Sequence, residues 1–283
     1  MSWQIYLLIS ILLISFIGLL QRSLMKDDRA NPQAHTIAFL GVGGIFAIIL
    51  ALFEGKLNLY FPSFLLWNFV LLVILITPAY LLNYRAYKQI GASEVVLFLA
   101  TGRLWNVVGA YIFLHESVSV QQIFGAIVIV LGVAITRFEQ RKFIFNSGVF
   151  FALIAAFLYG MSDIDGYYIL RFYDATNFLI YAEFLPVIAI MLLQPKSLAK
   201  LTHYFHIDTA IKLLILCICD IFGTLALFLA YQVGGKASII GPLSATRVLI
   251  ATILAIIILH ERKNITNKII GTIVTIVGVL LLL

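Results

Sequence analysis

The sequence predicts an all-α polytopic membrane protein, with ten transmembrane helices arranged as two inverted five-helix repeats. Three observations support this prediction: an apolar composition, a succession of apolar runs of helix length, and an internal repeat. Of the 283 residues, 63% are hydrophobic and only 11% are charged, with a mean hydropathy of +1.07. A soluble domain carries roughly 25% charged residues, because water surrounds its surface. We therefore expect an integral, multi-pass protein surrounded by membrane lipids.

Ten apolar segments are each long enough to cross the roughly 30 Å hydrocarbon core of a bilayer as a helix. The first segment follows Met1-Ser2-Trp3-Gln4, without the basic region and cleavage site of a signal peptide, so we expect a retained span. Aromatic residues cluster at several segment ends, as is typical of membrane interfaces. The segments lie at residues 3–20, 34–53, 64–84, 91–114, 119–137, 147–170, 175–194, 209–232, 237–259 and 267–283.

The chain repeats itself at a spacing of 145 residues. This shift places Ala100-Thr101 on Ala245-Thr246. It also places Leu114-His115-Glu116 on Leu259-His260-Glu261. An ordered series of such matches indicates two homologous halves.

We place these halves at residues 1–142 and 143–283. Each half holds five predicted spans, an odd number, so the second half enters the membrane in the opposite orientation. Inverted repeats are typical of secondary transporters, in which two related halves enclose a site at the membrane midplane.

The end of the first half resembles the closing helix pair of an EamA-type half. It has the small-residue start Gly91-Ala92-Ser93 and a long helix that ends in Leu114-His115-Glu116. The second copy runs from Lys236 to Val279 and keeps Gly241-Pro242, which such helices often carry. With ten predicted spans, the chain resembles the drug/metabolite transporter (DMT) superfamily, EamA type, over its full length.

The resemblance implies a central cavity lined by the first four spans of each half. It also implies both termini in the cytoplasm and, for a short chain of this kind, a bacterial inner (plasma) membrane. Members of the superfamily export amino acids, amines, drugs or sugars, or exchange nucleotide sugars and phosphates. We therefore expect a small-molecule substrate.

Charged side chains inside the predicted spans are candidate site residues, because a charge in hydrocarbon is costly. Glu183 and Asp220 are the best candidates for proton coupling or cation recognition. Five carboxylates against two arginines leave a formal charge of −3, which favours protonation or a bound cation. The charged candidates are Glu94, Arg103, Asp163, Asp165, Glu183, Asp220 and Arg247.

Arg103 and Asn106 are three residues apart and share one helix face, and Arg247 occupies the corresponding place in the second half. Two arginines from symmetric positions could clamp a carboxylate, while the acids recognise an amine. The alternative is that each arginine only pairs with an acid and holds helices in register. Six aromatic residues are candidate walls of the site, although packing or interface anchoring also explains such aromatics. They are Tyr84, Tyr87, Trp105, Tyr159, Tyr167 and Tyr168.

Other polar motifs have simpler explanations than chemistry. His115 and His260 sit at a helix exit once in each half, which favours a role in fixing the turn. Ser119 and Gln122 resemble a capping box. We expect no metal site, no cofactor and no catalytic residue, because the chain shows no supporting ligand set and no glycine-rich phosphate loop.

The glycine pairs Gly125/Gly132 and Gly271/Gly278 each form a stripe of two helical turns. Such stripes favour close helix packing, and a homodimer through these helices is one way to use them.

Basic residues are distributed unequally between the predicted loops. Loops after odd-numbered spans carry 14 Lys and Arg residues, and those after even-numbered spans carry 3. The positive-inside rule then puts both termini outside, whereas the family resemblance puts both inside. The net charge of +6 is explained by these loops and anionic lipids, so no nucleic-acid partner is expected.

The leading functional hypothesis is a secondary transporter, most simply an exporter, of small polar metabolites such as amino acids or amines. A proton-coupled antiporter would suit the buried acids. The alternative within the same fold is a lipid-linked or nucleotide-sugar carrier or flippase. A membrane-embedded enzyme is less favoured, because the sequence lacks an intramembrane His cluster and a Gly-x-Ser-x-Gly turn.

Overall fold

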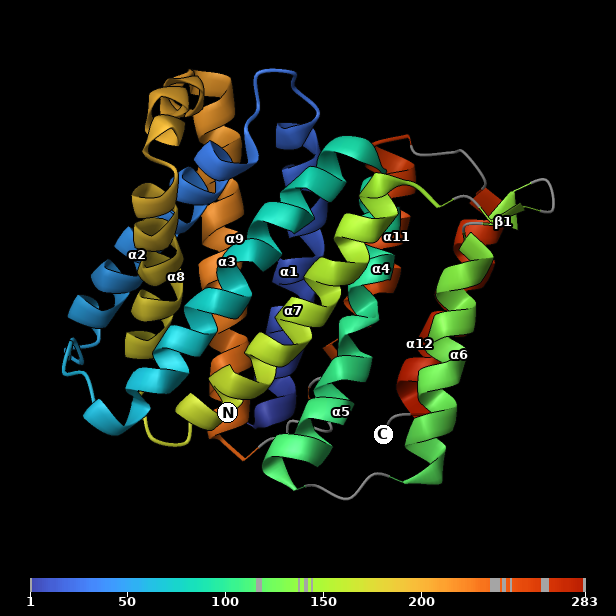
Figure 1. The fold of residues 1–283 in the computed structure, drawn as a ribbon, viewed down its shortest axis with the longest axis horizontal. Helices are drawn as coiled ribbons and strands as arrows, with labels where there is room; N and C mark the ends of the chain where they lie inside the picture. Colours follow the sequence, from blue (N-terminus) through green and yellow to red (C-terminus); the bar gives the residue numbers. More distant parts are fainter. Residues whose placement is uncertain are drawn as a thin grey trace.

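The computed structural model shows a bundle of helices joined by short connections (Figure 1). It describes residues 2–115, 119–136, 138–139, 142–143, 145–234, 240, 243–244, 246–260 and 265–281. A short antiparallel pair, β1 (Phe138–Glu139) and β2 (Lys142–Phe143), joins the two halves. The helical segments are α1 (Trp3–Met25), α2 (Pro32–Phe53), η1 (Ser63–Leu65), α3 (Leu66–Gln89), α4 (Ala92–Ala100), α5 (Gly102–Leu114), α6 (Val120–Thr136), α7 (Ser147–Ile169), α8 (Ala175–Leu193), η2 (Pro195–Phe205), α9 (Ile207–Gln232), α11 (Arg247–Ile258) and α12 (Ile265–Leu281).

Seven helical stretches within the described residues are long and apolar enough to span a membrane. They match seven of the ten predicted spans, with α4 and α5 together forming the fourth. The other predicted spans, 119–137, 237–259 and 267–283, correspond to the shorter α6, α11 and α12. A helix of 17 residues, such as α6, is about 25 Å long and falls short of the hydrocarbon core. The count of ten is therefore not confirmed at these three segments.

The helix packing shows a two-fold relation between the two halves. The helix α1 packs on α9, and α7 packs on α3; these two contacts exchange when the halves are exchanged. The pairs α2–α8, α4–α11 and α6–α12 are each formed by corresponding helices of the two halves. Such pairing is what a two-fold axis between the halves produces.

A break in the fourth and ninth spans recurs in both halves. The Thr101 hydroxyl donates to the Phe98 carbonyl at 2.7 Å, and the Thr246 hydroxyl donates to the Leu243 carbonyl at 2.7 Å. The helices α5 and α11 begin directly after these threonines. The break therefore places Arg103 and Arg247 in the first turn of a helix in the bundle interior.

The histidines that follow these helices are turn residues, as predicted. His115 and His260 adopt the left-handed conformation with φ of 55° and 54°, which ends a helix. The capping box is confirmed, since the Ser119 N–H donates to Gln122 Oε1 at 2.8 Å and the Gln122 N–H donates to Ser119 Oγ at 3.2 Å. The neighbouring Glu116, Glu261 and Gly241-Pro242 lie outside the described residues.

The glycine stripes of α6 and α12 face each other within one chain. A Cβ atom on Gly278 would lie 2.8 Å from the Gly125 carbonyl oxygen, and one on Gly132 would lie 2.8 Å from the Gly271 carbonyl oxygen. Both stripes are therefore used in packing the two halves together. A homodimer would need other faces of these helices, and it remains a proposal.

Candidate functional site

A cavity of about 220 Å³ that contains charged side chains in its lining lies where the first four spans of each half converge. Its wall is formed by residues of α1, α2, α3, α4, α5, α7, α8, α9 and α11. Five of the charged residues predicted from the sequence line it together, although they come from five different helices. These residues are Arg103, Asp163, Glu183, Asp220 and Arg247.

An ion pair crosses one side of the cavity. The guanidinium of Arg103 lies 2.9 Å from the Asp163 carboxylate and joins α5 to α7. Arg103 is almost fully buried, while the Asp163 side chain remains 38% exposed. The amide of Asn106 lies behind the pair, where its oxygen accepts from Arg103 at 3.2 Å and its nitrogen donates to the Gly160 carbonyl at 3.1 Å. Of the two alternatives for the arginines, a clamp for a substrate carboxylate or an ion pair with an acid, the ion pair is the one observed for Arg103.

Glu183 on α8 is the most deeply buried carboxylate of the cavity. Its side chain is 3% exposed, and Oε2 has no hydrogen-bond partner among the described residues. The carboxylate approaches α2 at Gly43, where a Cβ atom would lie 2.8 Å from Oε2. A glycine at this position is what lets the acid fit between the two helices. An orphaned carboxylate oxygen inside a bundle needs a proton, a cation or a ligand to offset its desolvation.

Asp220 and Arg247 complete the charged lining from α9 and α11. Thr224, one turn further along α9, is a hydrogen-bonding neighbour of Asp220. Among the ion pairs of the described residues, Arg103 takes part in one and Arg247 in none. Three carboxylates and two guanidiniums give the lining a formal charge of −1, which corrects the −3 expected from the sequence.

The remaining predicted site residues lie outside the cavity lining. Asp165 is 6% exposed and accepts from Asn68 Nδ2 at 2.7 Å, so it joins α7 to α3. Glu94 is half-buried in the first turn of α4. The ring of Trp105 packs edge-on against Phe157 at 4.8 Å between centroids and is 38% exposed. None of these three residues is among those that line the central cavity.

The family model of the EamA-like transporter family matches residues 1–138 and 146–283, which is nearly the whole chain. The chain belongs to the EamA-like transporter family. The boundary predicted between residues 142 and 143 falls in the gap between the two matches. The expected resemblance to the drug/metabolite transporter superfamily is confirmed, and the protein is an integral, multi-pass membrane transporter.

No curated protein matches this chain. One solved structure, described only as the crystal structure of a protein, superposes with a TM-score of 0.69 at 14% sequence identity. The match covers 99% of this chain and 95% of that chain. At this identity the likeness supports the fold alone.

Tyr80 and Asn83 of α3 are cavity residues that the sequence did not single out, unlike their neighbour Tyr87, which was a candidate wall and also lines the cavity. Tyr80, Asn83 and Tyr87 are spaced three and four residues apart, so they share one helix face. The ring of Tyr80 packs edge-on against Tyr159 at 5.5 Å, and Asn83 donates to the Tyr159 hydroxyl at 3.5 Å. Tyr159 thus lines the cavity as predicted. The i, i+3, i+7 spacing inside an apolar run was the signal for this face.

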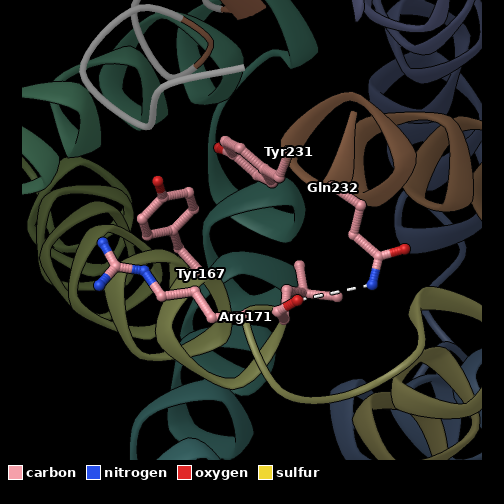
Figure 2. Close-up of a pocket in the computed structure, with 5 residues that line it drawn as sticks. Tyr167, Arg171, Tyr231 and Gln232 are labelled. Carbon is pink, nitrogen blue, oxygen red and sulfur yellow. Dashed lines mark hydrogen bonds between the residues drawn. The ribbon is translucent and has the colours of Figure 1, made fainter. Parts of the chain in front are cut away.

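A second pocket, of about 410 Å³, lies at the end of α7 and α9 (Figure 2). The rings of Tyr167 and Tyr231 meet edge-on at 5.4 Å, and the Arg171 guanidinium lies 4.9 Å from the Tyr167 ring centre. Gln232 donates to the carbonyls of Leu170 at 3.5 Å and Tyr173 at 2.8 Å.

This outer pocket continues the helix faces of the central cavity. Tyr167 follows Asp163 by one turn of α7, and Tyr231 follows Leu227 by one turn of α9. The two tyrosines of the outer pocket therefore lie one helical turn beyond residues that line the central cavity.

Proposed function

We propose that this transporter is a secondary, proton-coupled exporter of small zwitterions or amines, with amino acids as the leading substrate class. The observation that carries the proposal is one cavity that holds both unpaired acids and a guanidinium. An amine would bind near Glu183 and Asp220, and a carboxylate would bind Arg247. An acid that alternately binds a proton or the substrate amine couples proton movement across the membrane to substrate movement in the opposite direction.

The size of the cavity favours small substrates over the alternative class. Pockets for drug-sized ligands have volumes of about 300–1,000 Å³. A cavity of about 220 Å³ suits an amino acid better than a nucleotide sugar or a lipid-linked sugar.

A transport panel tests the proposed function. Purified protein in proteoliposomes is given radiolabelled amino acids, amines and nucleotide sugars, with a pH gradient of either sign. We expect uptake driven by the gradient for at least one amino acid or amine. Uptake of nucleotide sugars alone would overturn the proposal in favour of the carrier alternative.

We expect Arg247→Gln to weaken amino-acid transport selectively. A charge-assisted hydrogen bond contributes about 1.5–3 kcal/mol, so the KM for an amino acid should rise about 10- to 100-fold. The KM for an amine without a carboxylate should stay near that of the wild type. Substrate competition in proteoliposomes measures both values.

The matched control for Arg247→Gln removes the other arginine together with its partner. Because Arg103 already pairs with Asp163, the double variant Arg103→Gln/Asp163→Asn leaves no buried charge unpaired. It should keep the preference for amino acids over amines. Equal KM increases for both substrate types in Arg247→Gln would contradict the proposed role of Arg247.

The distribution of basic residues supports a membrane orientation for this proposal. The start of α1, the end of α12 and the ends of α7 and α9 lie on the same side of the bundle (Figure 1). The outer pocket is formed at the ends of α7 and α9, and the loops of this side carry few Lys and Arg residues. By the positive-inside rule this side is extracellular, in a bacterial plasma membrane. The alternative expectation from the family resemblance places it in the cytoplasm.

We expect Tyr231→Ala to open the central cavity toward the outer pocket. The test uses Thr224→Cys in a background with Cys217→Ser and Cys219→Ser, which removes the two native cysteines. A membrane-impermeant thiol reagent is added outside intact cells, and the rate at which it labels the Thr224→Cys variant is measured with and without Tyr231→Ala. Labelling should be faster with Tyr231→Ala, because the Tyr167–Tyr231 contact is lost. Phe157→Ala, at a ring contact outside the cavity, is the control. Labelling only in inverted vesicles would reverse the proposed orientation.

A further inference from the structure

His35 on α2 is a fully buried ionisable residue that the transport cycle proposed above does not use. Its ring packs edge-on against Tyr84 at 4.5 Å, and it stacks on Phe39 at 6.1 Å and lies 5.5 Å from the ring of Tyr204. Its exposed fraction is 0%, and neither ring nitrogen has a hydrogen-bond partner among the described residues. Buried polar groups are nearly always hydrogen-bonded, so an orphaned imidazole in a membrane bundle calls for a function.

On one side, His35 adjoins the central cavity. Phe39, which stacks on its ring, lines the cavity. Tyr84, the edge-on partner, accepts a hydrogen bond from Gln21 at 3.3 Å, and Gln21 also lines the cavity. The ring of Tyr84 further stacks against Tyr80, another residue of the lining, at 6.1 Å. A single layer of side chains therefore separates His35 from the cavity.

On the other side, His35 adjoins the end of the bundle with the basic loops. Tyr204 of η2 is 4% exposed and has the backbone of Asn31 as a hydrogen-bonding neighbour. The ring of His203 lies 5.2 Å from that of Tyr204, and His203 Nε2 lies 3.6 Å from the Asp27 carboxylate. The Arg29 backbone N–H donates to Asp27 and holds the pKa of that carboxyl below its ordinary value. The row of rings thus ends at an ionised carboxylate.

We propose that His35 carries protons between the central cavity and the face of the basic loops. This inference rests on the proposed function and assigns the route for the coupled proton. A neutral imidazole has one N–H and one free nitrogen. It accepts a proton from the cavity side at the free nitrogen and releases the proton of the opposite nitrogen to the Tyr204 hydroxyl, which passes its own proton to the imidazole of His203. Rotation of the ring restores the starting form, and no other bond is made or broken.

The charged and titratable groups around this route come from α3, from η2 and from the loop between α1 and α2. Tyr84 of α3 faces the imidazole from the cavity side, and Tyr204 and His203 of η2 lie toward the surface. Asp27 and Lys88 lie at the surface end, where Lys88 Nζ donates to the Ala30 carbonyl at 2.6 Å.

Two transport assays on the same proteoliposomes separate a proton route from a structural role. Uptake of a mixture of radiolabelled amino acids driven by a pH gradient requires the proton to cross. Counterflow, the exchange of labelled for unlabelled amino acids without a gradient, requires only that the substrate site alternates. We expect His35→Gln and His35→Phe to lose gradient-driven uptake at least about 100-fold, because a positioned proton-transfer group contributes about 10²- to 10⁴-fold. The rate of counterflow should stay within about twofold of the wild-type rate. This is a small effect, since a tenfold change corresponds to about 1.4 kcal/mol.

Thr36→Val is the matched control, since Thr36 is equally buried on α2 and its hydroxyl donates only to the Pro32 carbonyl at 2.8 Å. It should retain both activities. Loss of both activities in both His35 variants, or retention of both, would overturn the inference and leave the proposed function intact. If the wild-type protein shows no counterflow, the proposed function itself fails, and this inference fails with it.

Discussion

Replacing Glu183 by glutamine will make amino-acid transport independent of pH. Glutamine has nearly the shape of glutamate, so it fits opposite Gly43, but it cannot exchange a proton. The orphaned Oε2 of Glu183 lies in the cavity lining, where a change of charge acts directly on a bound substrate. We expect the response of uptake to a pH gradient to fall at least about 100-fold, because a positioned proton-transfer group contributes about 10²- to 10⁴-fold. Uptake in proteoliposomes at several internal and external pH values measures this response.

Asp165→Asn provides the control for Glu183→Gln. Asp165 is also a buried carboxylate with an unpartnered oxygen, but it contacts Asn68 and lies outside the cavity lining. The Asp165 variant should keep the pH dependence of the wild type. If both variants lose it, burial of acids in general governs the pH response. If Glu183→Gln keeps it, Glu183 is not the coupling residue.

The second large effect concerns the packing of α6 against α12. A Cβ atom on Gly132 would lie 2.5 Å from the Thr275 backbone nitrogen and 2.8 Å from the Gly271 carbonyl oxygen. Neither backbone atom can rotate away, so Gly132→Ala forces the helices apart. Overpacking of this kind costs about 1–3 kcal/mol. We expect a lower melting temperature in detergent, which a thiol-reactive dye can follow through exposure of the buried Cys217.

Gly41→Ala is the matched control for Gly132→Ala. Gly41 is also a helical glycine, but no heavy atom outside its own helix backbone lies within 4 Å of the added Cβ. Alanine is favoured over glycine in a helix by about 1 kcal/mol, so this variant should melt at or above the wild-type temperature. If Gly132→Ala has the same melting temperature as Gly41→Ala, the α6–α12 interface is not tightly packed in solution.

The different positions of Asp163 and Asp165 could not be predicted from the sequence. Each residue of a helix turns about 100°, so acids two positions apart must point to different sides. Sequence alone could not tell which acid would face the cavity, because that depends on how α7 is rotated between its neighbours. In the structure Asp163 meets Arg103 across the cavity, while Asp165 meets Asn68 on α3.

His35 marks a second limit. A lone histidine in an apolar helix carries no local pattern, and its neighbours Tyr84 and Tyr204 come from distant parts of the chain. The glycine stripes could be predicted in part, because their seven-residue spacing indicated close helix packing. Only the tertiary structure showed that Gly132 and Gly278 face the opposite helix of the same chain.

The sequence by itself determined the membrane environment, most of the helices and the two-fold repeat. These properties follow from hydrophobicity, helix length and residue order, which are local along the chain. The repeat also predicted the paired turns at His115 and His260, because equivalent residues adopt equivalent backbone conformations. The tertiary structure decided which charges share the cavity and which glycines touch a partner. Those contacts depend on the rotation and separation of helices that lie far apart in the sequence.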